Sequence, residues 1–204
     1  MSSGPLLDQF GHIDIYLFDQ LLRGRITPGM RIVDAGCGTG RNLVHLLREG
    51  YDVYATDQDP QAVDAVRALA ATLAPHVPAD HFRVEPVERL SFADASVDVV
   101  ISNAVLHFAR DHAHFDAMVK EMWRVLKPGG LFFARLASSI GMADRMQPLG
   151  GGRHQMPDGS ERYLVDEAKL MATTWRLGGR QLDPLKTTIV QDQRCMTTWV
   201  LGRA

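Results

Sequence analysis

Three glycines separated by single residues, Gly36, Gly38 and Gly40, directly follow a short apolar run that ends in Asp34. Glycine permits the positive φ values of a tight turn and lets a backbone come close to a ligand. The helical pattern after the turn supplies free N–H groups that can face a polar or anionic group. The stretch therefore predicts a strand, a ligand-binding turn and a helix.

A second apolar run, residues 53–56, ends in Asp57 and is followed by Gln58. Asp57 lies about twenty residues beyond the first glycine, where an acid in such folds accepts hydrogen bonds from ribose hydroxyls. The two strand ends together favour a nucleoside-containing cofactor.

A third apolar run, residues 97–102, leads into Asn103, Ala104 and His107. Ligands bind outside the carboxyl ends of strands in open α/β sheets, so this loop is expected at the site. His107 could deprotonate a hydroxyl, a thiol or an acid, or it could pack beside the cofactor. Arg135, near the end of the next expected strand, either pairs with a core acid or faces an anionic acceptor.

Four segments, VDAGCGTGRN, the acid of ATDQDP, SVDVVISNAVLHF and WRVLKPGGLFF, resemble class I S-adenosylmethionine-dependent methyltransferases of the small stand-alone bacterial type. The resemblance covers roughly residues 30–136 and implies S-adenosyl-L-methionine as cofactor and methyl transfer to a small molecule. The cofactor-binding positions that it implies are Asp34, Gly36, Gly38, Asn42, Asp57, Gln58, Val87, Asn103 and Ala104.

Within this resemblance, Asp34 would orient the turn or meet the methionine ammonium, and Asn42 would help to cap the helix. Gln58 and Val87 would border the adenine. The sequence departs from the family pattern at Pro86, which occupies the position that commonly carries an acid toward the adenine amino group. Glu85 and Glu88 are nearby acids, but neither falls in the usual register.

On the acceptor side we expect His107 as the candidate catalytic residue and Arg135 and Tyr16 as candidate substrate contacts. Correct positioning of a nucleophile can contribute about 7–11 kcal/mol, against roughly 3–5 kcal/mol for a general base. Catalysis in such a fold therefore does not require a basic side chain. His112 and His114 lack a third ligand at a suitable spacing, so no metal is expected.

The pattern predicts one domain over residues 1–204, with a three-layer, doubly wound, seven-stranded and mostly parallel α/β sheet. The expected strand order is 3-2-1-4-5-7-6, because the last two strands, residues 187–191 and 196–201, are joined closely enough only for an antiparallel pair. Residues 1–27 should form a helical cap, and residues 138–163 an irregular, lid-like insertion. The helix after the glycine turn is expected over residues 39–49.

A net charge of −2 offers no broad basic surface, so a nucleic-acid partner is not expected. The sequence lacks long apolar runs and a signal-peptide pattern, which predicts a cytoplasmic protein without membrane contact. A homodimer is expected only because dimers are the commonest oligomers of soluble proteins. Two alternatives remain: a non-catalytic cofactor-binding regulatory or partner protein, and a nicotinamide-dependent oxidoreductase.

Overall fold

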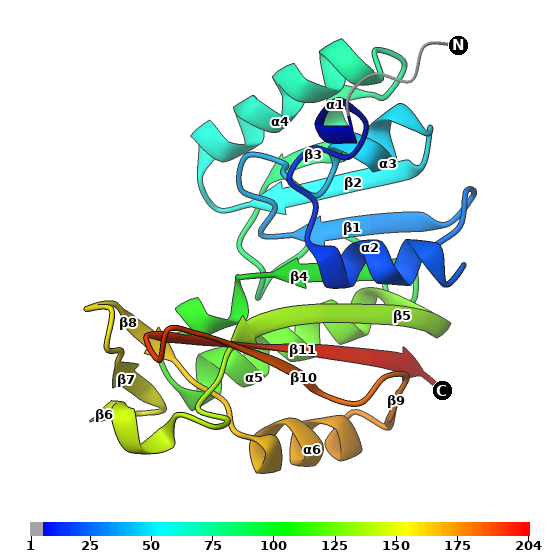
Figure 1. The fold of residues 1–204 in the computed structure, drawn as a ribbon. Coiled ribbons are helices and arrows are strands. Elements are labelled where there is room, and N and C mark those ends of the chain that lie inside the picture. The colour runs from blue at the N-terminus through cyan, green and yellow to red at the C-terminus, as the bar shows by residue number, and fades with distance from the viewer. Residues whose placement is uncertain (1–5) are drawn as a thin grey trace.

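A large mixed sheet organises the computed structural model, which describes residues 6–204 (Figure 1). Seven strands run in the order β10-β11-β5-β4-β1-β2-β3, and an eighth, β9, pairs with β11. The strands are β1 Arg31–Ala35, β2 Asp52–Asp57, β3 Phe82–Val84, β4 Val97–Asn103, β5 Leu126–Ala137, β9 Gly179–Gln181, β10 Lys186–Val190 and β11 Arg194–Arg203.

The pairing of these strands confirms the predicted topology. Strands β1, β2, β3, β4 and β5 pair in parallel, whereas β11 is antiparallel to both β5 and β10. Read from β3, the order is the expected 3-2-1-4-5-7-6. The extra strand β9 was not predicted, because three residues are too few to show a period of two.

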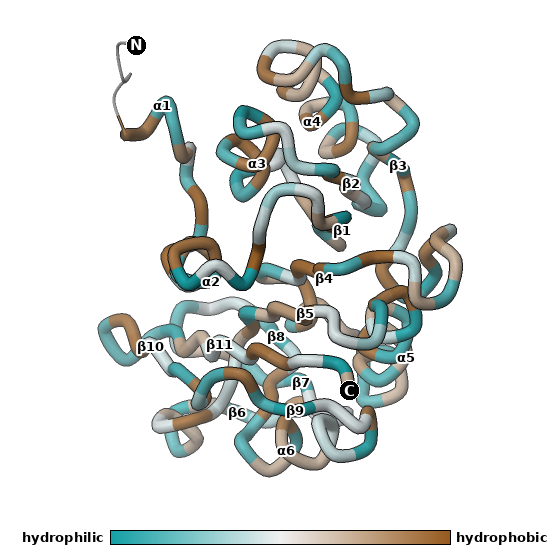
Figure 2. The backbone as a smooth tube through the Cα atoms, turned by 90° about the vertical axis from the view of Figure 1, so that its right-hand side faces the viewer, coloured by the Kyte–Doolittle hydropathy of each residue, from teal (hydrophilic) through white to brown (hydrophobic). Residues whose placement is uncertain are grey.

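Consecutive strand residues enter two separate cores, which makes the fold three-layered. Val99 and Ile101 pack with residues of the helices α2 Ile15–Leu22, α3 Val44–Arg48 and α4 Pro60–Leu73. Val100 packs with residues of α5 His112–Val125 and α6 Glu167–Arg176 on the other face. A run that is apolar on both faces is typical of a parallel strand covered by helices. Figure 2 shows the matching pattern in the helices, in which brown and teal segments alternate along the coil.

Helices α4, α5 and α6 each begin at an aspartate cap. Asp59, Asp111 and Asp166 accept hydrogen bonds from backbone N–H groups in the first turns of α4, α5 and α6. The helices are α1 Leu6–Phe10, α2 Ile15–Leu22, α3 Val44–Arg48, α4 Pro60–Leu73, α5 His112–Val125 and α6 Glu167–Arg176. Within residues 6–204, none of them is long and apolar enough to cross a membrane.

The helix after the glycine turn is shorter than predicted, and the expected role of Asn42 as its cap is wrong. Helix α3 begins at Val44, and its N-cap residue, Leu43, makes no side-chain capping bond. The Asn42 Oδ1 atom instead accepts a hydrogen bond from the backbone N–H of Asp14, at 3.0 Å. Asn42 therefore ties the N-terminal helices to the glycine turn. Residues 1–5 of the predicted 1–27 cap lie outside the described residues.

The expected irregular insertion, residues 138–163, contains a second sheet, which corrects the prediction of unstructured chain. Strands β6 Gln147–Gly150, β7 Arg153–Gln155 and β8 Glu161–Tyr163 form it in antiparallel order. Met142, Met146 and Met156 form a buried cluster together with Cys195. In Figure 1 it lies at the lower left, on the side toward which the arrowheads of β1, β4 and β5 point.

Candidate active site

The glycine turn is held against the ends of two neighbouring strands. The N–H groups of Gly36 and Cys37 both donate to the carbonyl oxygen of Thr56, at 2.8 and 2.9 Å. Gly36 has φ +81°, and a Cβ atom there would lie 2.5 Å from a methyl carbon of Val105. This position therefore requires glycine both for its backbone conformation and for the close approach of the β4 loop.

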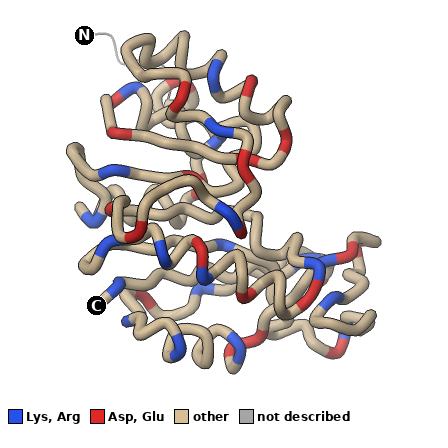
Figure 3. The backbone as a smooth tube through the Cα atoms, turned by 180° about the vertical axis from the view of Figure 1, so that it is seen from behind, with Lys and Arg blue, Asp and Glu red and all other residues tan. Residues whose placement is uncertain are grey.

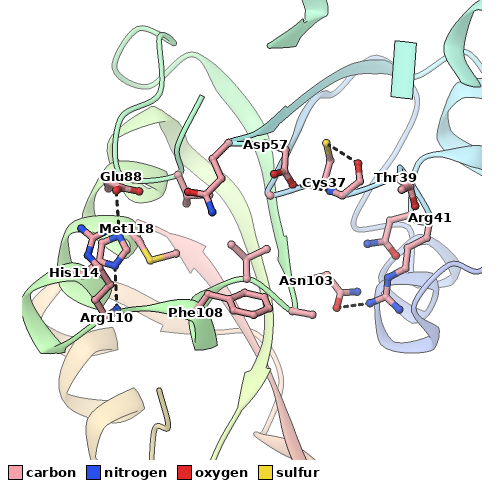
Figure 4. A pocket seen from close by; sticks show the side chains of 17 residues that line it. Cys37, Thr39, Arg41, Asp57, Glu88, Asn103, Phe108, Arg110, His114 and Met118 are labelled. Carbon is pink, nitrogen blue, oxygen red and sulfur yellow. Dashed lines mark hydrogen bonds and ion pairs between the residues drawn. The ribbon is translucent and has the colours of Figure 1, made fainter. Parts of the chain in front are cut away.

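A cavity of about 550 Å³ opens beside this turn, at the carboxyl ends of β1, β2 and β4 (Figure 4). The structure brings most of the predicted cofactor residues to its wall, namely Gly36, Gly38, Asn42, Asp57, Gln58, Val87, Asn103 and Ala104. Asp34 is not part of the wall and is only 1% exposed. The wall also contains Glu88, one of the two acids noted near Pro86, together with Arg41 and Phe108, which the sequence did not assign to a cofactor site.

The carboxylate of Asp57 is fixed by backbone donors at the edge of this cavity. Its Oδ2 atom accepts from the N–H of Gly38 at 2.9 Å, and its Oδ1 atom accepts from the N–H of Asp59 at 3.0 Å. A carboxylate has about four acceptor sites, so each oxygen can accept a further hydrogen bond. Asp57 is thus a preorganised acceptor for a pair of hydroxyl groups.

Two buried polar side chains beside the turn lack partners among the described residues. Neither carboxylate oxygen of Asp34 has a hydrogen-bond partner, and burial raises the pKa of this group from 3.8 to about 7. The Nδ2 atom of Asn103 is also unpartnered, although its Oδ1 atom accepts from Arg41 at 2.9 Å. Because buried polar groups are rarely left unpaired, these atoms indicate a site for a polar ligand.

The far end of the cavity carries a carboxylate beside an oriented imidazole. The backbone N–H of Arg110 donates to His114 Nδ1 at 3.1 Å, so the proton of the neutral ring is on Nε2. That Nε2 atom lies 3.1 Å from Glu88 Oε1 (Figure 4). Glu85, in contrast, is engaged by the backbone and hydroxyl of Ser91 and does not line the cavity.

A second cavity, of about 380 Å³, adjoins the first, and Arg41 and Ala104 line both. Ala104 has φ +65°, a conformation that non-glycine residues seldom adopt and that is often found at functional sites. His107 and Arg135 both line this second cavity.

His107 lies in an environment that makes it a poor base. The N–H of Ala137 donates to its Nδ1 atom at 3.3 Å, which leaves the ring proton on Nε2. Burial, together with the positive charge of Arg162, lowers the pKa of His107 from 6.5 to about 4. The ring is therefore neutral near pH 7, and its accepting nitrogen is already used. This geometry favours a role for His107 as a hydrogen-bond donor over a role as a general base.

Arg135 both pairs with a buried acid and faces the second cavity. Its Nη1 atom donates to Asp14 Oδ2 at 2.8 Å, and its guanidinium carbon lies 5.4 Å from the centre of the Tyr16 ring. The Tyr16 hydroxyl shares a hydrogen bond of 2.9 Å with Thr188. Tyr16 lines neither cavity, so in this structure it contacts Arg135 without reaching the cavity wall.

No group of three or more His, Cys, Asp or Glu side chains in the described chain is arranged to hold a metal ion. His112 instead shares a hydrogen bond of 2.9 Å with the hydroxyl of Tyr163.

The fold is that of class I methyltransferases, and comparison with known proteins identifies the family. A family model described as a methyltransferase domain matches residues 33–134, which is half of the chain. The chain therefore belongs to the methyltransferase domain family, whose cofactor is S-adenosyl-L-methionine. This result confirms the resemblance inferred from the sequence and sets aside the nicotinamide-dependent alternative.

Individual relatives agree with this assignment. The malonyl-(acyl-carrier protein) O-methyltransferase of Serratia marcescens is 32% identical over 134 residues, which cover 64% of this chain and 49% of the relative. A methyltransferase structure from Methanosarcina mazei has a TM-score of 0.71 at 21% identity and covers 90% of this chain and 96% of its own.

A third similar protein was solved with ligands. The 1,6-didemethyltoxoflavin-N1-methyltransferase of Burkholderia thailandensis, with its acceptor and S-adenosylhomocysteine bound, has a TM-score of 0.68 at 18% identity and covers 90% of this chain and 75% of its own. These structural likenesses concern the fold. The chain spans about half the length of the curated relatives it matches.

The first cavity fits S-adenosyl-L-methionine on the structure's own evidence. The cofactor carries two ribose hydroxyls, an ammonium and a carboxylate, and it needs acceptors and donors in matching number. Asp57 offers free acceptor sites, Asp34 has two unpartnered oxygens, and Asn103 has an unpartnered donor. A Cβ atom at Gly38 would meet nothing within 4 Å, so the turn leaves open space for a ligand.

Proposed function

We propose that this protein transfers the methyl group of S-adenosyl-L-methionine to a small molecule bound in the second cavity. The observation that carries the proposal is the shared wall of the two cavities, formed by Arg41 and Ala104. Ligands in two cavities that share lining residues would lie close together, and methyl transfer requires the reacting atoms to be in contact.

In this proposal Asp57 accepts the ribose hydroxyls, Gln58 and Val87 border the adenine, and Gly36 and Gly38 admit the ligand to the backbone. Asn103 and Ala104 line the methionine side, and Asp34 provides negative charge behind the turn. The raised pKa of Asp34 supports this role, because a nearby ammonium would restore the charged form.

Glu88 is our candidate for the acid that Pro86 lacks. Glu88 lines the first cavity, whereas the nearby Glu85 is engaged by Ser91. The Nε2 atom of His114 lies 3.1 Å from Glu88 Oε1 at the cavity wall. A carboxylate there can accept a hydrogen bond from the exocyclic amino group of adenine.

When bound, S-adenosyl-L-methionine supplies an electrophilic methyl group that a nucleophile takes in a single in-line displacement. The residues of this chain would bind and orient the two reactants and exclude water from them. Such positioning can lower the barrier by about 7–11 kcal/mol. The neutral His107 ring would donate its Nε2 proton in a hydrogen bond to the acceptor. General-base catalysis by His107 stays a prediction that this geometry disfavours.

A non-catalytic cofactor-binding protein is the remaining alternative, and product formation separates the two. Purified protein would be incubated with methyl-labelled S-adenosyl-L-methionine and separate panels of phenols, amines, thiols and carboxylic acids. We expect S-adenosylhomocysteine to form above the acceptor-free rate with at least one panel, and to fall to that rate in Asp57→Ala. Cofactor binding without product from any panel would support the non-catalytic alternative.

A further inference from the structure

The second cavity is more basic than the rest of the molecule. Four arginines from separate parts of the chain, Arg41, Arg135, Arg162 and Arg194, line it, against the single acid Asp158. Elsewhere basic and acidic residues are interspersed along the backbone, as Figure 3 shows from behind. The clustering arises only in the folded chain, because strand β5, the insertion and β11 meet here.

Two of these guanidinium groups form no close ion pair within the described residues. Arg194 Nε lies 3.6 Å from Asp158, and Arg135 pairs with Asp14. Arg41 and Arg162 form no ion pair there. Arg41 donates to the amide oxygen of Asn103, at 2.9 Å, and Arg162 to the backbone carbonyl of Glu161, at 2.8 Å. Both keep their full positive charge at the cavity wall.

Arg162 and Arg135 are also held in place before any ligand binds. The guanidinium carbon of Arg162 lies 5.1 Å from the centre of the Phe108 ring. Arg135 is fixed by Asp14, whose second oxygen accepts from the N–H of Tyr16 at 2.9 Å. The Nε atom of Arg135 is buried and has no partner within the described chain. Positioned guanidinium donors of this kind match the oxygens of a carboxylate or a phosphate.

Part of the remaining wall is apolar. Met156, Val190, Met196 and Ala137 contribute aliphatic and thioether surface next to the arginines. Methionine side chains adapt to irregular apolar groups, so this surface suits a hydrocarbon portion of a ligand. The cavity thus combines a charged and an apolar region in a volume of about 380 Å³.

We propose that the second cavity binds a small methyl acceptor that carries a carboxylate or a phosphate group, held by Arg162, Arg41 and Arg135, with its apolar portion against the methionines. This inference rests on the proposed function, because it takes the second cavity to be the acceptor site. It adds that the methyl acceptor is an anion, which the fold does not specify.

The test uses amphiphiles with hydrocarbon chains of nearly equal length and different head groups. Octanoate, octyl phosphate and the neutral octanamide would be titrated calorimetrically into the protein saturated with S-adenosylhomocysteine. We expect at least one of the two anions to bind about tenfold more tightly than octanamide, and this preference to shrink as ionic strength rises. The tighter anion identifies the head group that the site prefers.

Arg162→Gln provides the residue-level test, since Arg162 has no ion-pair partner to leave unpaired. The matched control is Arg153→Gln, in the adjacent strand, whose guanidinium pairs with Glu161 and does not line the cavity. We expect Arg162→Gln to weaken anion binding about tenfold and leave octanamide binding unchanged. The control should behave like the wild-type protein.

Equal binding of octanoate, octyl phosphate and octanamide, or equal effects of the two arginine variants, would overturn the inference. Titration with S-adenosylhomocysteine alone keeps the two proposals apart. If this nucleoside binds and the protein does not prefer the anions over octanamide, only the proposal of an anionic acceptor is wrong. If the nucleoside does not bind, the proposed function fails, and anion binding is then measured without it.

Discussion

Asp34→Asn should stabilise the unliganded protein above neutral pH, although we propose that Asp34 interacts with the bound cofactor. Asp34 is 1% exposed, its oxygens have no partner within the described chain, and burial raises its pKa from 3.8 to about 7. Each pKa unit corresponds to about 1.4 kcal/mol, so ionisation of the folded protein costs at most about 4 kcal/mol.

The pH dependence gives this prediction its sign. Between the unfolded and the folded pKa, the folded state binds the proton and the unfolded state does not, so stability falls as the pH rises through this window. Below it both states are protonated and the cost is absent. Above about pH 7 the cost is complete, and the uncharged amide of the Asp34→Asn variant avoids it.

Urea unfolding of both proteins, followed by tryptophan fluorescence, measures this effect. Between about pH 4.5 and pH 8 the stability of Asp34→Asn relative to wild type should rise by about 3 kcal/mol. Contributions of the amide that do not depend on pH cancel in this difference. The control is Asp64→Asn, whose carboxylate is 71% exposed and should show no such trend. The same relative stability of Asp34→Asn at both pH values would refute the reasoning.

Three further changes test the turn, the buried ion pair and the adenine end. Gly36→Ala should lower the free energy of unfolding in urea by about 3 kcal/mol, because the added Cβ atom clashes with Val105 and the residue has a positive φ. Gly38→Ala should lower it by only about 1–2 kcal/mol and should mainly weaken S-adenosylhomocysteine binding, measured by calorimetry. Similar effects of the two changes would contradict the turn geometry. Arg135→Met should lower the free energy of unfolding in urea by about 3 kcal/mol, because it leaves the Asp14 carboxylate buried without its ion-pair partner. Adding Asp14→Asn should restore most of this stability, and no restoration would argue against the ion pair. Glu88→Ala should weaken S-adenosylhomocysteine about tenfold but leave S-inosylhomocysteine, which lacks the amino group, unchanged. Equal losses for both ligands would exclude the adenine role.

Local signals were sufficient to predict the sheet and one side of the site. The glycine turn and Asp57 lie at strand ends within about twenty residues of each other, and parallel strands bring such ends together whatever the rest of the chain does. The apolar periodicity of α4 and α5, and the aspartate caps at their starts, likewise lie within the sequence of each helix itself. These features therefore follow from the sequence without tertiary information.

Features that depend on distant contacts could not be predicted in this way. Asn42 has the residue type of a helix cap, but its oxygen is used by Asp14, 28 positions earlier. The strands of the insertion are three or four residues long, too short for an alternation of apolar and polar positions to be recognised. The arginines of the second cavity come from segments that meet only after folding.

The most direct test of the central claim is calorimetric titration of the protein with S-adenosyl-L-methionine, S-adenosylhomocysteine and NADH. We predict binding of the two sulfur nucleosides at micromolar concentrations and no binding of NADH. Asp57→Ala should abolish this binding, while the exposed control Asp64→Ala should retain it. A well-folded protein that binds neither sulfur nucleoside, or an Asp57→Ala variant that binds them as wild type does, would contradict the assignment of the cofactor site.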